Sequence, residues 1–136
     1  MSSCIFCKIS AGEIPAAKVY EDEVVFAFLD IGPISDGHTL VVPKQHIETL
    51  HGCPSQLLGQ ICSRLGKIAG AVAKAMNSDG YNVLCNTGRA AGQVVEHLHF
   101  HIIPRKTGDG VFNRWPSYKY KQGRAEEIVA GIRKNL

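Results

Sequence analysis

Three histidines occupy alternate positions in a short apolar stretch near residue 100. His97, His99 and His101 are separated by single apolar residues. Successive side chains of a β-strand point to opposite faces, so the imidazoles would share one face while the apolar residues anchor the strand in a core. A single histidine on a strand is usually structural, but three titratable rings together cost solvation and, when protonated, repel one another. The stretch therefore predicts a chemical site, either for metal ligation or for nucleophilic attack on phosphate.

The hydrophobic pattern predicts the elements that position this strand. Stretches rich in β-branched and aromatic residues indicate strands, and apolar residues at three- and four-residue steps indicate one long helix from Ser55 to just before Asn77. Its apolar stripe includes Cys62, and a second, short helix is expected near 125–134. Strands that follow one another, with one long helix inserted, are typical of an antiparallel α+β domain. The predicted strands are 19–20, 24–29, 39–42, 81–85 and 97–103.

The composition is typical of one soluble globular domain. A chain of 136 residues, with 45% hydrophobic and 20% charged residues, can hold one domain with one core. The net charge of +3 favours anionic ligands such as nucleotides and does not indicate a surface that coats nucleic acid. No stretch approaches the roughly 18 apolar residues of a membrane span, and the N-terminus lacks a leader pattern. We therefore expect a cytoplasmic protein whose five cysteines form no secreted disulfide framework.

The histidine stretch belongs to a longer set of motifs that resembles the histidine triad (HIT) family. The family signature is H-φ-H-φ-H-φ-φ, in which φ is apolar, and residues 97–103 match it directly after Gly92-Gln93 and three further residues. Other segments follow the family in order and spacing, so the resemblance covers about residues 4–106. These segments are 24–33, 37–46 and 86–88.

The resemblance implies a HIT-like fold, which is a five-stranded antiparallel sheet with one long helix and short flanking helices. Such domains usually assemble as homodimers, and the apolar stripe of the long helix permits a dimer interface without requiring one. Residues 1–136 would form a single HIT domain, with a core of about 4–106 and a basic C-terminal extension over 107–136.

The resemblance also implies a reaction at an α-phosphate. His99 would be the nucleophile that forms a nucleotidyl-histidine intermediate, and His101 would hydrogen-bond the phosphoryl oxygens. Such catalysis consists of positioning and charge stabilisation, so the nucleophilic step requires no divalent ion. Asp30 would accept hydrogen bonds from the ribose hydroxyls. The remaining nucleotide ligands would be Phe6, Phe28 and Ile31 around the base, and Asn86, Gly92, Gln93 and Val94 around the phosphate.

Some of these residues also have structural interpretations. Asp30 could cap the loop that contains Pro33, and Phe6 and Phe28 could be ordinary core residues. Members of the family commonly carry a hydroxyl residue directly after the Gly-Gln pair, where this chain has Val94. One side-chain donor to phosphate is therefore missing, and backbone amides of the loop would have to serve instead.

A second candidate site begins with Cys4 and Cys7, whose C-x2-C spacing lets two thiolates hold one tetrahedral ion. No second such pair exists, so the spacing alone also fits free thiols or a redox pair. Bacterial-type HIT proteins with a similar pair bind zinc through it, through a histidine after a Pro-Lys-x segment and through the first triad histidine. The resemblance thus implies a closed, structural zinc site of Cys4, Cys7, His46 and His97, in which neither histidine could protonate a leaving group.

The other histidines and cysteines receive simpler interpretations. His38 and His51 remain as unused alternative metal ligands. The three remaining cysteines are expected to pack as small hydrophobic residues. They are Cys53, Cys62 and Cys85.

The region after the triad mixes features of two branches of the family. Residues 104–109 resemble the segment that follows the triad in dinucleoside polyphosphate hydrolases, whereas Trp115-Pro116 resembles the C-terminal Trp-Pro of nucleoside phosphoramidases. The sequence does not decide between the branches. The basic residues further along are expected to form a solvated surface, and they include Lys119, Lys121 and Arg124.

The leading prediction is a hydrolase or transferase that acts on AMP-linked nucleotides, namely nucleoside phosphoramidates, aminoacyl-adenylates or dinucleoside polyphosphates. One alternative is a nucleotide-binding adaptor whose hydrolysis is incidental. Another is a cupin-like enzyme in which His97, His99 and His101 ligate iron or manganese, against which the Gly-Gln lead-in argues. We expect a purine nucleotide as ligand and a second copy of the chain as partner, and neither a membrane nor nucleic acid.

Overall fold

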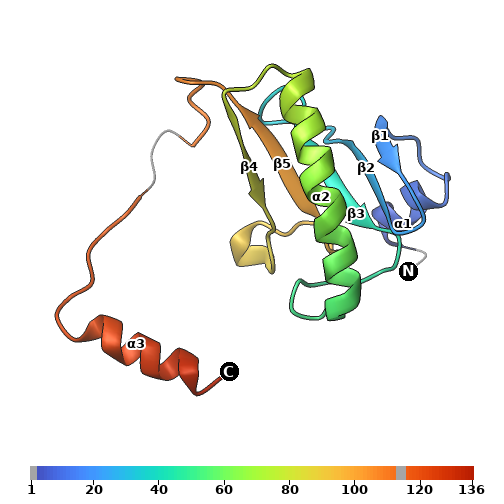
Figure 1. Ribbon diagram of the computed structural model, residues 1–136. Coiled ribbons are helices and arrows are strands. Elements are labelled where there is room, and N and C mark those ends of the chain that lie inside the picture. The colour runs from blue at the N-terminus through green and yellow to red at the C-terminus, as the bar shows by residue number, and fades with distance from the viewer. Residues whose placement is uncertain (1–2, 113–115) are drawn as a thin grey trace.

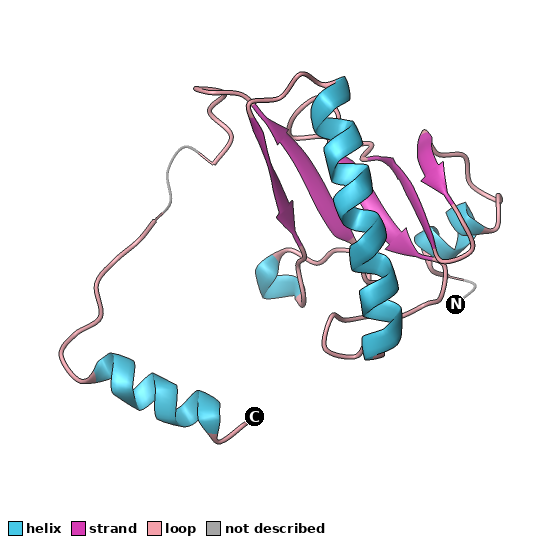
Figure 2. Cartoon of the chain, viewed as in Figure 1, coloured by secondary structure: helices cyan, strands magenta, loops and turns pink. Residues whose placement is uncertain are grey.

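A five-stranded antiparallel sheet forms the centre of the protein (Figures 1 and 2). The computed structural model describes residues 3–112 and 116–136. The strand order is β1-β2-β3-β5-β4, and every neighbouring pair is antiparallel. The expected α+β fold with a five-stranded antiparallel sheet is confirmed. The strands are β1 (Lys18–Glu21), β2 (Val25–Leu29), β3 (Thr39–Pro43), β4 (Gly80–Leu84) and β5 (Phe100–Arg105).

The long helix α2, Ser55–Ala75, covers one face of this sheet (Figure 1). Its buried residues recur at three- and four-residue steps, so they form one stripe that packs on alternate residues of β2, β3 and β5. Cys62 was predicted to be in this stripe, but it is exposed because it lies beside the stripe, one residue after the buried Ile61. The core on this face consists of Val25, Ala27, Val41, Cys53, Ile61, Leu65, Ile68, Ala69, Leu98, Phe100 and Ile102.

The opposite face of the sheet is covered at one end by the short helix α1, Ile5–Ser10 (Figure 1). No side chain caps its N-terminus and no acidic residue lies in its first turn, and a helix of this length is not stable alone. It is held by Phe6 and Ile9, which are buried against β2 and β3. This smaller core consists of Phe6, Ile9, Phe26, Phe28, Leu40 and Val42.

The histidine strand is shorter at its start than the sequence predicts. The predicted strand was 97–103, whereas β5 begins at Phe100. Pairing with β3 covers only Phe100 to Ile102, and the Leu98 amide instead donates to the carbonyl of Ile47 at 2.6 Å. The alternation of side chains nevertheless holds, since Leu98 packs in the core under α2 while His99 packs against Phe6 on the other face.

The C-terminal helix α3, Arg124–Arg133, stands apart from the sheet and from α2 (Figures 1 and 2). None of its residues is buried, and Lys119, Lys121 and Arg124 are exposed as expected. The Trp115 of the predicted phosphoramidase feature lies outside the described residues. Among residues 3–112 and 116–136, no helix combines the length and the apolar character that crossing a lipid bilayer requires.

Candidate functional site

A cavity of about 760 Å³ opens on the face of the sheet opposite α2. It lies between α1, the end of β2 with the loop that follows it, and the loop before β5, and most of its lining is apolar. Two predicted nucleotide ligands, Asn86 and Gln93, are not among the lining residues. The predicted ligands that do line the cavity are Phe6, Phe28, Asp30, Ile31, Gly92, Val94, His99 and His101.

The hydrogen bond of His99 determines which of its nitrogens is free. Nδ1 lies 2.7 Å from the carbonyl oxygen of His97, and because a carbonyl can only accept, Nδ1 carries the proton. The lone pair of Nε2 is therefore available. Burial lowers the pKa of His99 although the bond to the carbonyl opposes this, so the ring is neutral at pH 7. A buried, neutral imidazole with a free lone pair has the properties of a nucleophile.

His38 determines the tautomer of His101 in the same way. The Ile34 amide donates to Nδ1 of His38 at 3.2 Å, so the His38 proton is on Nε2, which donates to Nδ1 of His101 at 2.8 Å. The His101 proton is then on Nε2, a buried atom with no hydrogen-bond partner among the described residues. Burial, followed by the neighbouring His99 and His38, lowers the pKa of His101 to about 4. His101 is thus a neutral donor without an acceptor in the wall of the cavity.

Sequence reasoning missed this role of His38, which it considered only as a spare metal ligand. The signal is tertiary, because His38 and His101 meet only when β3 pairs with β5, where Leu40 lies opposite His101. The other spare histidine, His51, is exposed and lies outside the cavity.

Asp30 makes the loop cap that is one of its two interpretations. Its Oδ1 accepts the Gly32 amide at 2.8 Å and so caps the loop, while Oδ2 lies 3.6 Å from Nε2 of His38. Asp30, His38 and His101 lie close enough to suggest a metal site. However, the facing nitrogens of the two histidines are only 2.8 Å apart, closer than the roughly 3.3 Å between two nitrogen ligands of one tetrahedral ion. They form a hydrogen-bonded chain instead.

The side chain of Gln93 is hydrogen-bonded within the loop before β5 and to a neighbouring segment. The buried Gln93 side chain accepts the Gly88 amide at 2.8 Å and donates to the Glu48 carbonyl at 2.8 Å. Gly92 has a φ of +95°, and a Cβ there would lie 3.3 Å from the Asn86 side-chain nitrogen. The Gln93 side chain therefore supports the loop that brings Gly92 and Val94 to the cavity, and the Asn86 side chain lies close to Gly92.

The four predicted zinc ligands come together beside the cavity. All four ligand atoms lie within 4.8 Å of one another. The His97 Nδ1 is 3.4 Å from the Cys4 sulfur and 3.7 Å from the Cys7 sulfur, and the Cys7 sulfur is 3.4 Å from Nδ1 of His46. Ligands of a tetrahedral zinc ion are separated by about 3.3–3.8 Å. His97 also donates from Nε2 to the Pro43 carbonyl at 2.8 Å, which leaves Nδ1 free to ligate. These residues fit zinc.

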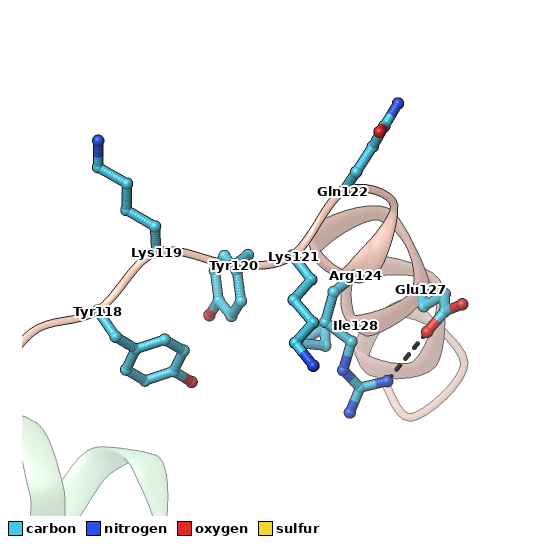
Figure 3. Close-up of a pocket in the computed structure, with 8 residues that line it drawn as sticks. All are labelled: Tyr118, Lys119, Tyr120, Lys121, Gln122, Arg124, Glu127 and Ile128. Carbon is cyan, nitrogen blue, oxygen red and sulfur yellow. Dashed lines mark hydrogen bonds and ion pairs between the residues drawn. The ribbon is translucent and has the colours of Figure 1, made fainter.

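A second hollow, of about 460 Å³, lies between residues 118–122 and α3 (Figure 3). Its lining contains Tyr118, Tyr120 and basic residues but neither histidine nor cysteine. The acid in its wall, Glu127, pairs with Arg124 at 3.0 Å. This hollow offers no group that is nucleophilic at neutral pH, so the candidate chemistry gathers at the cavity near the histidines.

The chain has an α+β fold, a cluster of two cysteines and two histidines, and two further histidines in the wall of a ligand-sized cavity. These features define a class of small α+β proteins with a histidine site. The sequence model of the HIT domain matches residues 11–108. The adenosine 5'-monophosphoramidase hnt1 of Schizosaccharomyces pombe is 46% identical, over 94% of this chain and 92% of its own length. The adenylylsulfatase HINT3 of Arabidopsis thaliana is 40% identical, over 99% of this chain and 70% of its own length. The chain belongs to the HIT family.

Solved structures agree with this assignment. A member of the HIT family from Bacillus subtilis matches with a TM-score of 0.90 and 47% identity, covering 98% of this chain and 97% of its own. A Zn-bound histidine triad family protein from Mycobacterium smegmatis matches with a TM-score of 0.76 and 34% identity, covering 99% of both chains. Cys4 and Cys7 lie before the segment matched by the family model, and the structure brings them together with His46 and His97.

Proposed function

We propose that this protein cleaves AMP-linked nucleotides at the α-phosphate through a nucleotidyl-histidine intermediate. The family and its phosphoramidase and adenylylsulfatase relatives support nucleotide hydrolysis. The observation that carries the finer proposal is the pair of tautomers in the cavity. His99 has a free lone pair on Nε2, and His101 has an unpartnered N–H. A nucleophile beside a donor is what an attack on a phosphoryl group requires.

In the first step, Nε2 of His99 attacks the α-phosphorus, and the bond from phosphorus to the leaving group breaks. The Nε2–H of His101 donates a hydrogen bond to the phosphoryl oxygens as charge develops on them, and it keeps its proton because its loss would leave an imidazolate. Water or the substrate itself is then the acid that protonates the leaving group. If His46 and His97 bind a metal, neither can act as this acid. The donor bond from His38 holds His101 in the required tautomer.

In the second step, a water attacks the phosphorus of the nucleotidyl-histidine, the bond between phosphorus and His99 breaks, and AMP leaves. The oxygen of the water stays on phosphorus and one of its protons goes to solvent, which balances the proton taken up by the leaving group, so both imidazoles end neutral. Because the Nδ1–H of His99 donates to the His97 carbonyl throughout, Nε2 is regenerated with its lone pair directed as before. The residues of this chain would thus promote both half-reactions by positioning the reacting groups and by stabilising charge.

The nucleoside part would occupy the apolar end of the cavity. Phe6 and Phe28 are 6% and 5% exposed, so both belong to the core and to the cavity wall, and Ile31 is fully exposed at its rim. We propose that these three contact a purine base. Asp30, whose Oδ2 is not used by the loop cap, would accept the ribose hydroxyls.

Turnover with His99→Asn tests this function. Wild-type protein should release AMP from an adenosine phosphoramidate, from adenylylsulfate or from a diadenosine polyphosphate. A rapid quench in alkaline denaturant, which preserves the acid-labile bond between phosphorus and histidine, should trap the labelled nucleotide on His99. His99→Asn should lose roughly 10⁴-fold or more in kcat while it still binds AMP. His51→Asn, at an exposed histidine outside the cavity, is the matched control. If wild type and H99N both bind AMP and their turnover is equal or absent, the protein would instead be a nucleotide-binding adaptor.

We propose a structural zinc ion held by Cys4, Cys7, His46 and His97. A closed set of four ligands leaves no position for water, so the ion would fasten the N-terminus to the segment before β5 rather than take part in the reaction. Elemental analysis of the purified protein should find one zinc per chain. Less than about a tenth of an equivalent, after purification without chelators, would contradict the site.

We also propose a homodimer in the cytoplasm. The edge strand β4 exposes Tyr81 and Val83, which are 45% and 42% exposed, and a second copy could cover them. Thiolate ligands fit a compartment that keeps cysteines reduced. Sedimentation equilibrium should give twice the chain mass, and Val83→Lys should shift the protein toward monomer.

A further inference from the structure

The short helix α1 belongs to both sites at once. Cys4, directly before its first turn, and Cys7, within it, belong to the proposed zinc site, and Phe6 lies between them. We call the four side chains of Cys4, Cys7, His46 and His97 the metal cluster. Phe6 and its neighbours Ile5 and Ile9 line the cavity. Because α1 has only six residues and no side-chain cap, its position depends on what holds it from outside.

Phe6 makes the contacts that link the metal cluster to the proposed nucleotide site. Its ring packs edge-on against His99 at a centroid distance of 5.0 Å and an interplanar angle of 83°. It also packs against His97 at 5.8 Å and against Phe28 at 5.6 Å. One aromatic ring thus touches a metal ligand, the nucleophile and the wall of the proposed base pocket.

His97 provides a second physical connection between the sites. Its ring lies in the metal cluster, while its backbone carbonyl accepts the Nδ1 proton of His99. A shift of His97 would therefore move the group that orients the nucleophile. Packed elements of this kind can carry a coupling free energy between two sites.

We infer that Phe6 is a positioning residue through which metal binding at Cys4 and Cys7 holds the nucleotide site in its binding form. The inference rests on the proposed nucleotide-binding function and goes beyond it by assigning the metal a measurable effect on nucleotide affinity. Coupling between two binding equilibria is reciprocal, so bound AMP must raise the zinc affinity by the factor by which zinc raises the AMP affinity.

The test measures both affinities on the full chain. AMP is titrated by calorimetry into zinc-loaded and chelator-treated protein, and zinc affinity is measured by competition with a chromophoric chelator, with and without saturating AMP. We expect removal of zinc to weaken AMP binding by about 5- to 100-fold, and AMP to raise the zinc affinity by the same factor. Hydrogen exchange on the zinc-free protein should show exposure of α1 with continued protection of α2 and the central strands.

Variants of Phe6 separate positioning from general stability. Phe6→Ala should bind AMP weakly and equally with and without zinc, while it keeps a wild-type zinc affinity that AMP no longer changes. Phe6→Leu retains an apolar side chain of similar size and should recover part of the coupling. It replaces F6A in the test if F6A does not fold. Cys62→Ala, at an exposed cysteine outside both sites, should keep the wild-type coupling factor.

The possible results distinguish failure of the coupling from failure of the proposed nucleotide-binding function. Equal AMP affinities of the zinc-loaded and zinc-free wild type would overturn the coupling while leaving nucleotide binding intact. A wild-type coupling factor between zinc and AMP in both F6A and F6L would contradict the positioning role of Phe6. Absence of AMP binding by the zinc-loaded wild type would overturn the proposed function, and the coupling with it.

Discussion

The two histidine clusters lie side by side and use the same residue type for different tasks. In the metal cluster, Nδ1 of His97 faces two thiols at distances typical of zinc ligands. In the cavity, Nδ1 of His101 faces another imidazole at 2.8 Å, and its Nε2 has no partner among the described residues. His97 and His101 are four residues apart, so the partners supplied by other elements decide what each ring can do.

One hydrogen bond determines which nitrogen of an imidazole is available for chemistry. His97 donates from Nε2 to Pro43 and so presents Nδ1 to the thiols, whereas His99 donates from Nδ1 to His97 and so keeps Nε2 free. The two rings, two residues apart, therefore expose opposite nitrogens.

Loss of the metal cluster should affect stability most. Cys7→Ala removes one of the four proposed zinc ligands, and a metal ion present at 1,000 times its Kd stabilises the native state by about 4 kcal/mol. We expect the free energy of unfolding in urea, with zinc present, to fall by roughly this amount. Cys62→Ala is the control, because Cys62 is exposed and not a ligand. An equal loss in C62A, or none in C7A, would place the stabilisation elsewhere.

Removal of the orienting partner of His101 should lower the rate with little effect on stability. His38→Asn takes away the donor that holds the proton of His101 on Nε2, and the loss of such an outer partner typically costs about 10- to 100-fold. We expect this loss in kcat with AMP affinity nearly unchanged. Nitrogen-15 NMR should show a mixture of His101 tautomers. A pure Nε2–H tautomer in H38N would contradict the assigned role.

Acid should destabilise the protein through the buried histidines of the cavity. The pKa of His101 is about 4 in the folded protein and about 6.5 when unfolded, so the unfolded chain binds more protons between these values. The free energy of unfolding should fall by on the order of 1–2 kcal/mol as the pH drops from 6.5 to 4, because partial solvent contact reduces the full effect. The free energy of unfolding of the His101→Asn variant should fall less over the same pH range. Identical pH profiles would contradict the shift.

A hydroxyl at position 94 should have the smallest effect. Val94→Thr keeps the shape of the side chain and restores a donor at the cavity, but Val94 is 90% exposed, so water competes for the new hydrogen bond. We expect kcat/KM for an adenosine phosphoramidate to rise by about 2- to 3-fold. Val94→Ala controls for the change at the methyl groups. A decrease in V94T with none in V94A would show that the apolar surface itself favours the substrate.

Local patterns predicted most of the fold. The period-two and period-3.6 patterns located all five strands and the long helix, because burial of one face selects these spacings. Two local expectations were wrong. Cys62 lies beside the buried stripe of α2, and the start of the histidine strand is not paired, because Leu98 bonds to Ile47. Both depend on which neighbour the segment meets, which periodicity does not contain.

The sequence by itself determined the three histidines at alternate positions, the cysteine pair and the family, since each depends on residue type and local spacing. Only the tertiary structure decided which nitrogen each histidine presents, because those partners are a carbonyl, an amide or a ring from elsewhere in the chain. His38 acquired its role when β3 met β5, and Gln93 became a support for its loop. Phe6 joined the two clusters only because α1 packs where both can reach it.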